Sequence, residues 1–181
     1  MSIWFKPNWA SRSVGGAGPD PEAVGCFFNL GEWSDPPVRS FWSLFEYDYH
    51  DASGTVIGFN SYTNGAAYGA GAVMANFRSN QWHQIVVTYS PSSVITWIDG
   101  TNAASASGCN IVPDKATRDY GFFIGSDTGG NQQAQGSYDL LETFNYPLSA
   151  SQIGSNYLYT IQSGQGFGAQ FSHPSAASPI P

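Results

Sequence analysis

The chain has 181 residues, of which 41% are hydrophobic, 15% aromatic and only 10% charged, and its formal net charge is −7. So many aromatics with so few charges exclude a disordered chain, which needs low hydrophobicity and high net charge. Six lysine and arginine residues give no basic surface, so we expect no nucleic acid partner and no anionic membrane partner. No apolar run approaches the roughly 20 residues of a membrane-spanning helix, so we also expect no membrane insertion.

Short aromatic and β-branched runs recur along the chain between clusters of Gly, Pro, Ser and Asn, and helical periodicity is nearly absent. The expected fold class is therefore all-β, a two-sheet antiparallel jelly-roll sandwich with minimal helix. The predicted strands are residues 3–6, 24–30, 41–49, 55–60, 82–89, 94–98, 121–125 and 138–144.

The strand at residues 82–89 has the clearest pattern. One of its faces is apolar apart from a histidine, so that face is expected to point inward. It consists of His83, Ile85, Val87 and Tyr89. The Ser-Pro-Ser-Ser run that follows predicts a hairpin turn, and Asp99-Gly100 predicts the next turn because glycine tolerates a positive φ.

The C-terminal part divides into a structured end and a tail. Ser149 and Gln152 form a capping-box pattern, which predicts one short helical turn through Ile153. Residues 163–181 contain no charged residue and no periodic apolar pattern. We therefore expect one domain over residues 1–162, followed by a Gly/Ser/Pro-rich linker or arm.

Several stretches in this order carry a family likeness: SIWFKP at 2–7, QWHQIVVTY at 81–89 with VITWIDG at 94–100, FFIGSD at 122–127, and GSYDLLE at 136–142 with LSASQI at 148–153. Together they resemble the laminin-G-like members of the concanavalin A-like lectin/glucanase superfamily, over residues 2–157. The resemblance implies the jelly-roll fold. It leaves the ligand open, since this fold hosts lectins, adhesion modules and glycosidases.

The resemblance also implies a strand ahead of residues 2–7, which this chain starts too late to contain. Its pairing partner, residues 138–144, would then present an open edge that attracts another strand. The missing strand could come from three sources: chain that precedes residue 1, a later segment of this chain that folds back, or a second molecule. We predict that the region from Tyr157 to Ser172 adds as this strand, in cis or in trans.

A glycine-flexed loop of oxygen donors predicts a calcium site. The candidate ligands are Asp127, Asn131, Gln133 and Asp139. The loop is similar to the calcium loop of pentraxin-like relatives, though shorter and less acidic. The alternative is that Asp127 caps a turn and Asp139 accepts backbone N–H bonds.

Catalysis is the least favoured hypothesis. Related glucanases carry Glu-x-Asp-x-Glu on one strand, and here Glu46, Asp48 and His50 take those places. The histidine leaves the second carboxylate of retaining hydrolysis missing. We therefore expect no enzyme, and we interpret His50 and His83 as local hydrogen-bonding residues.

Aromatic side chains in or beside loops offer platforms on which a sugar ring can stack. The candidates are Trp9, Trp33, Trp42 and Tyr62. The alternative for each of them is a place in the core. Cys26 and Cys109 either form a disulfide or stay buried thiols, and no Cys/His cluster suggests zinc.

These observations favour a non-catalytic recognition or adhesion module that binds carbohydrate or protein with possible help from Ca²⁺. No basic and apolar leader precedes Ile3, so the chain is either cytosolic or a segment of a longer secreted or displayed protein. The low charge and many aromatics favour the second, and we expect a segment displayed outside a cell or on a particle. The alternatives are a structural subunit of a self-assembling filament or particle, and a degenerate glycosidase.

Overall fold

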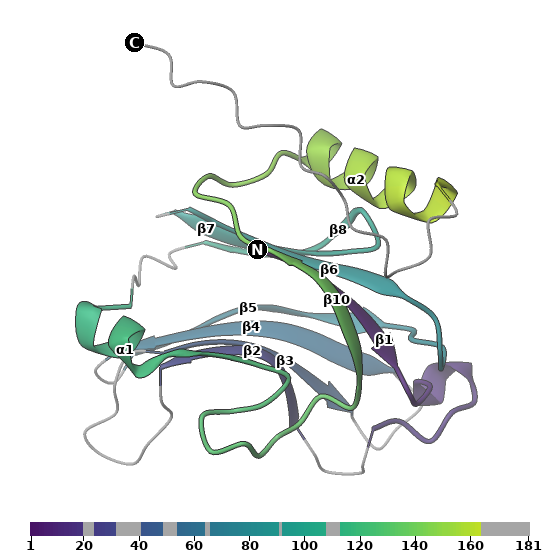
Figure 1. The fold of residues 1–181 in the computed structure, drawn as a ribbon, viewed down its shortest axis with the longest axis horizontal. Helices are drawn as coiled ribbons and strands as arrows, with labels where there is room; N and C mark the ends of the chain where they lie inside the picture. Colours follow the sequence, from purple (N-terminus) through teal and green to yellow (C-terminus); the bar gives the residue numbers. More distant parts are fainter. Residues whose placement is uncertain are drawn as a thin grey trace.

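The computed structural model describes residues 1–19, 24–31, 41–48, 54–63, 66–90, 92–107 and 113–163. Two five-stranded antiparallel sheets stack face to face, and a helix lies on the far side of one of them (Figure 1). The all-β jelly-roll sandwich expected from the strand pattern is confirmed. In the described ranges, no helix has the length and apolar character needed to cross a membrane.

The strand order is β10-β1-β6-β7-β8 in sheet A and β5-β4-β3-β2-β9 in sheet B. Sheet A contains β1 (Ser2–Pro7), β6 (His83–Ser90), β7 (Ser93–Ile98), β8 (Thr101–Ser107) and β10 (Gly136–Glu142). Sheet B contains β2 (Val24–Gly31), β3 (Phe41–Asp48), β4 (Thr55–Thr63), β5 (Ala66–Ala75) and β9 (Phe122–Ile124). The helical elements are η1 (Arg12–Val14), α1 (Lys115–Tyr120) and α2 (Ala150–Gln162).

The core lies between the two sheets. Phe5 of β1 meets Phe27 of β2 with ring centroids 4.8 Å apart, which ties one sheet to the other. Ile85 and Val87 of β6 are buried in the same cluster, so the face of this strand that was expected to point inward does so.

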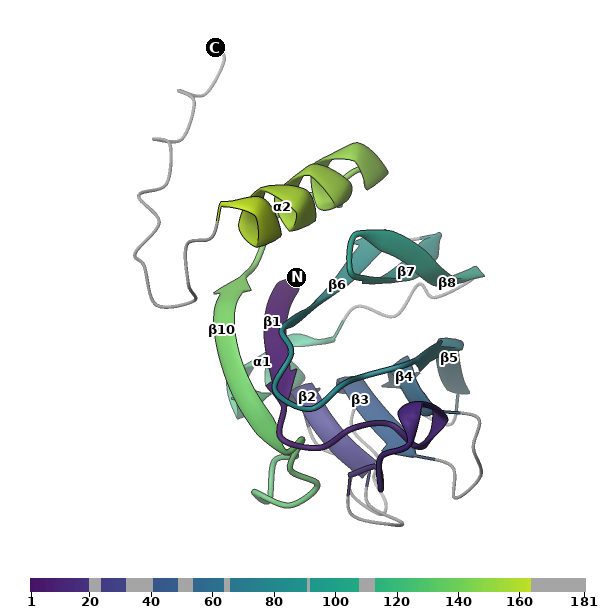
Figure 2. The ribbon, with the colours of Figure 1, turned by 90° about the vertical axis from the view of Figure 1, so that its right-hand side faces the viewer.

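The outer side of sheet A is also covered, because α2 packs on it. Ile153 of α2 is fully buried in a second apolar cluster with Val86 and Trp97. Nearby, Tyr157 stacks on Trp4 with ring centroids 5.9 Å apart and planes 8° from parallel. Figure 2 shows α2 on the side of sheet A that faces away from sheet B. The outer face of sheet B therefore lies on the opposite side of the molecule from this helix.

Helix α2 is longer than the sequence indicated. The capping box at Ser149 and Gln152 is present, as expected. The helix does not stop after one turn but continues to Gln162. The prediction of a strand beginning at Tyr157 is therefore wrong for residues 157–162, and the remainder of that segment lies outside the described residues. Packing of Ile153 and Tyr157, four residues apart on one helix face, outweighs the β propensity of the segment.

Strand β10 lies at the edge of sheet A and pairs with β1, from Ser2 opposite Glu142 to Pro7 opposite Gly136. Its other side has no strand partner among the described residues. Addition of a strand from a neighbouring molecule remains a prediction. The tail proposed for residues 163–181 falls outside the described ranges from residue 164 onward.

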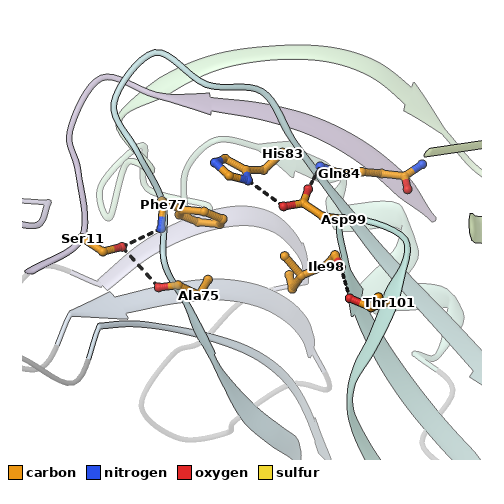
Figure 3. A network of polar contacts seen from close by, with 8 residues as sticks. All are labelled: Ser11, Ala75, Phe77, His83, Gln84, Ile98, Asp99 and Thr101. Carbon is orange, nitrogen blue, oxygen red and sulfur yellow. Dashed lines mark hydrogen bonds and ion pairs between the residues drawn. The ribbon is translucent and has the colours of Figure 1, made fainter. Parts of the chain in front are cut away.

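Both predicted turns around β7 are present. Ser90 pairs directly with Ser93, which makes a tight hairpin, and Asp99 and Gly100 turn the chain with φ of 50° and 77°. Figure 3 shows that Asp99 also holds the neighbouring strand, because its carboxylate lies 2.8 Å from Nδ1 of His83 and accepts the Gln84 N–H at 2.9 Å. His83 is therefore a local hydrogen-bonding residue, as expected.

Candidate functional site

Of the four aromatic residues proposed as sugar platforms, the two whose side chains are described, Trp9 and Trp42, both pack inside the sandwich. Trp9 is only 8% exposed and packs on Phe77, so it belongs to the core and presents almost no surface to a ligand. Trp42 points between the sheets, where it meets Tyr89 at 4.8 Å. Trp33 lies outside the described residues. Tyr62 is placed on β4 opposite Phe41, but its side chain is not described.

The residues proposed to bind calcium make local hydrogen bonds. Asp127 Oδ1 accepts the N–H groups of Gly129 at 3.0 Å and Asn131 at 2.7 Å, which closes a turn. Asp139 Oδ1 accepts the N–H of Leu140 at 2.8 Å. Gln133 donates to the Gly130 carbonyl. Within the described ranges, no three Asp, Glu, His or Cys side chains gather into a group suited to a metal ion.

Calcium binding remains a prediction that a melting experiment tests. If the Asp127 loop and Asp139 ligate Ca²⁺, millimolar Ca²⁺ should raise the melting temperature, because a ligand that binds only the native state stabilises it. The Asp139→Ala variant should lose that increment. A melting curve that neither Ca²⁺ nor EDTA changes would leave the hydrogen bonds described above as the whole role of these residues.

Glu46, the first residue of the catalytic hypothesis, is fully buried and points to the interior of the sandwich. A Cβ on Gly25 would lie 2.4 Å from its Oε1, which shows how closely β2 covers the carboxylate. Burial, followed by the charge of Glu46, raises the pKa of Tyr138. Because Glu46 has no exposed surface, it has no access to a sugar substrate in this structure. His50 lies outside the described ranges.

The outer face of sheet B carries a hollow of about 310 Å³, here called the sheet-face groove. Strands β2, β3 and β4 form its floor, and the loop between β9 and β10 forms one wall. The floor residues are Val24, Cys26, Asn29, Ser43, Phe45 and Asn60, and the wall residues are Asp127, Thr128 and Gln132.

Polar side chains cross the floor in a row because of strand register. Asn29 pairs with Ser43, and Ser43 pairs with Asn60. Directly paired residues of antiparallel strands point to the same side of the sheet. With strands about 4.8 Å apart, the row spans roughly 10 Å. Amide and hydroxyl groups in such a row can donate to and accept from the hydroxyl groups of a sugar. Asn29 and Ser43 are only 5% and 8% exposed, so the half-buried Asn60 presents the most surface of the three.

Phe45 adds an apolar surface beside this row. It is half-buried, and its ring lies over Gly58 of the neighbouring strand. A Cβ at Gly58 would come within 2.6 Å of the ring atom Cζ, so the glycine makes room for the ring. The result is a flat aromatic surface on the floor, next to hydrogen-bonding groups.

The wall is held to the floor by backbone hydrogen bonds. Cys26 donates its N–H to the Gln132 carbonyl at 2.7 Å, and Gly125 donates to the Phe27 carbonyl at 3.0 Å. The turn closed by Asp127 stiffens the loop from within. In Figure 1 this loop passes below β2 and β3. A wall fixed in this way costs little ordering entropy when a ligand binds.

Cys26 lies in the floor as a free, buried thiol. Its Sγ donates to Gln132 Oε1 at 3.5 Å and lies 3.8 Å from Ser43 Oγ. Burial raises the pKa of this thiol, and the nearby charges of Asp127 and Glu46 raise it further. The thiol is therefore protonated at neutral pH and acts as a weak hydrogen-bond donor. Cys109 lies outside the described residues.

A second hollow of about 360 Å³, here called the end pocket, opens between the two sheets. Its walls are mostly apolar, and the aromatic residues among them include Phe28, Trp42, Phe59, Tyr89, Phe122 and Tyr146. Trp42, one of the proposed platform residues, is thus part of the wall of this pocket. The end pocket is the more apolar of the two hollows, although Thr88, Thr143 and Asn145 also line it.

The sequence analysis singled out Asp127 of the wall as a candidate calcium ligand, but it missed Asn29, Ser43, Phe45 and Asn60 of the floor because it looked for tryptophan and tyrosine in loops. The useful signal was the alternation of β3, where Ser43 and Phe45 lie between the buried residues Leu44 and Glu46. Alternation identifies the outer face of one strand. It cannot say which residues of β2 and β4 lie beside that face, since the pairing register is a tertiary property.

Solved structures of similar fold come from several proteins. Domain 4 of AbnA, a GH43 extracellular arabinanase from Geobacillus stearothermophilus in complex with arabinotriose, is 18% identical with a TM-score of 0.61. That alignment covers 85% of this chain and 63% of the arabinanase chain, so this chain spans less than two thirds of it. At such identity the likeness concerns the fold alone.

Two further structures are similar. The Ruminococcus gnavus IT-sialidase CBM40 bound to α2,3-sialyllactose is 12% identical, with a TM-score of 0.55 over 86% of this chain and 80% of that chain. A heptameric SAP-like pentraxin from Limulus polyphemus is 13% identical, with a TM-score of 0.53 over 86% and 67% of the two chains.

No curated protein sequence matches the chain. A family model does match it, over residues 2–154, which is most of its length. The family resemblance expected from the sequence is therefore confirmed. The protein belongs to the Laminin_G_3 family of the concanavalin A-like lectin/glucanases superfamily.

Proposed function

We propose that the protein is a carbohydrate-binding module, acting outside the cell, that holds its ligand in the sheet-face groove. The observation that carries the proposal is the half-buried amide of Asn60 beside the half-buried ring of Phe45, with the more deeply buried Asn29 and Ser43 continuing the polar row. A sugar presents hydroxyl groups around its rim and apolar C–H groups on its faces. The amide and hydroxyl groups of the row can hydrogen-bond the hydroxyl groups of the sugar, and the aromatic ring can pack against its apolar C–H face.

Two similar structures support the ligand class, since they contain arabinotriose in one case and sialyllactose in the other. The proposal assigns no catalytic role to the groove. Asp127 is the one carboxylate among its described lining residues, whereas hydrolysis of a glycosidic bond by the common mechanisms uses two.

Asn60→Ala tests the proposal without disturbing the core, because Asn60 is half-buried on the outer face. Binding should first be sought on a glycan array, and the best ligand should then be titrated calorimetrically. Loss of one hydrogen bond, about 1 kcal/mol, should weaken binding about fivefold.

Tyr146→Ala is the matched control, since Tyr146 is 54% exposed and lines the end pocket instead. It should leave the affinity unchanged. If Tyr146→Ala weakened binding and Asn60→Ala did not, the ligand would occupy the end pocket and the groove assignment would be wrong.

A further inference from the structure

We infer that the sheet-face groove selects short, uncharged saccharides and discriminates against acidic ones such as uronates and sialylated glycans. This inference rests on the proposed carbohydrate-binding function and adds the class of sugar. It follows from which charges line the groove and which do not.

The groups that can hydrogen-bond a ligand in the groove are almost all neutral. Amides come from Asn29, Asn60 and Gln132, and hydroxyl groups come from Ser43 and Thr128. Such groups both donate and accept, which suits sugar hydroxyl groups. None of them supplies the positive charge that makes a strong hydrogen bond to a carboxylate.

The one charged side chain among the described lining residues is Asp127. Its Oδ1 accepts two backbone N–H groups, which fixes the carboxylate in the wall. A ligand carboxylate in the groove would meet a like charge at short range, partly shielded from water. Repulsion between such groups is stronger than between charges in bulk solvent.

No lysine or arginine is among the described residues that line the groove, and three of the described cations interact with groups elsewhere. Lys6 lies 5.0 Å from the ring centroid of Trp82, and Lys115 pairs with Asp119 on α1. Arg118 donates to the carbonyl of Pro113. The net charge of −7 adds a general repulsion of acidic ligands.

The size of the groove sets the length of the ligand. A volume of about 310 Å³ lies at the lower end of the roughly 300–1,000 Å³ typical of ligand pockets. The polar row is only three strands wide. The groove therefore suits a short saccharide or a chain end.

The test compares neutral sugars with their acidic counterparts. An array of gluco-, galacto-, xylo- and arabino-oligosaccharides should be printed beside oligogalacturonates and sialyllactose. The best neutral hexose ligand and the same sugar with its C6 hydroxymethyl group oxidised to a carboxylate should then be titrated at low and high salt. The acidic form should bind at least about tenfold more weakly at low salt, and the difference should shrink as salt screens the charges.

Asp127→Asn identifies the source of the discrimination. Asparagine retains an oxygen that can close the same turn, so the wall should keep its shape while the charge is lost. Affinity for the acidic sugar should rise toward that for the neutral one, with little change for the neutral ligand. Thr128→Lys is a second test in which Asp127 is unchanged. A lysine on the wall should also strengthen binding of the acidic sugar.

Each other outcome has a distinct meaning. Equal or tighter binding of the acidic sugar by the wild-type protein would overturn the inference and leave the proposed function intact. If the acidic sugar binds more weakly than the neutral one and neither variant raises its affinity, the charge in the groove is not the cause. That result would also overturn the inference. Failure to bind any saccharide on the array would refute the proposed function, and the inference would fall with it.

Discussion

Phe45→Ala should weaken saccharide binding by about tenfold or more, the largest effect expected of any single change in the groove. Stacking of a nucleic-acid base on an aromatic side chain contributes about 1–3 kcal/mol. A comparable contribution from the apolar face of a sugar corresponds to about tenfold or more, since 1.4 kcal/mol is a factor of ten. The ring lies on the floor beside Ser43 and Asn60, so its loss removes the apolar half of the site. Calorimetric titration of the array-selected ligand measures the change.

Gly58→Ala provides an independent way to disturb the same ring. The added Cβ would lie 2.6 Å from Cζ of Phe45, so the ring must move although its chemistry is unchanged. Binding should fall in this variant too. Tyr159→Ala is the control, because Tyr159 is a 62% exposed aromatic residue on α2, on the opposite side of the sandwich. Wild-type affinity in Phe45→Ala would exclude the ring from the binding site.

Ile153→Ala should lower the free energy of unfolding by about 2–5 kcal/mol, the usual range for truncating a fully buried isoleucine. Ile153 has no exposed surface and fills the contact between α2 and the Val86 and Trp97 side chains of sheet A. Alanine would leave a cavity at the centre of that contact. Urea unfolding, followed by tryptophan fluorescence, measures the loss.

Ile161→Ala is the matched control for this prediction. It removes the same atoms from the same helix, but at a position that is 47% exposed. The control should change stability by less than about 0.5 kcal/mol plus a small helix-propensity effect. Equal effects at the two positions would mean that α2 does not pack on sheet A through Ile153.

Much of the fold was predictable because its signals are local. The alternation of His83, Ile85, Val87 and Tyr89 identified the buried face of β6, and this pattern needs no knowledge of the neighbouring strands. The Asp99-Gly100 turn and the Ser149 capping box were equally readable, because each is made within four residues. Binary pattern and turn residues together determined an antiparallel sandwich.

Tertiary contacts determined the secondary structure of segments whose local propensity is weak or favours another conformation. β5 and β8 consist largely of Ala, Gly, Ser and Asn, which are poor strand formers, and they are strands because β4 and β7 pair with them. The aromatic and β-branched residues from Tyr157 to Ile161 have the propensity for a strand, yet they are helical. The helix is favoured because it buries Ile153 and stacks Tyr157 on Trp4.

The candidate site depended on tertiary structure most of all. Asn29, Ser43, Asn60 and Asp127 come from four separate parts of the chain, and of these only Asp127 was distinctive in the sequence, as a candidate calcium ligand. Strand register places the first three in a row, and the hydrogen bond from Cys26 to Gln132 brings the loop of Asp127 beside them. The sequence by itself determined which residues can form strands, turns and a helix start. Only the pairing of distant segments decided which polar groups share a surface, because register and loop docking depend on contacts across the whole sandwich.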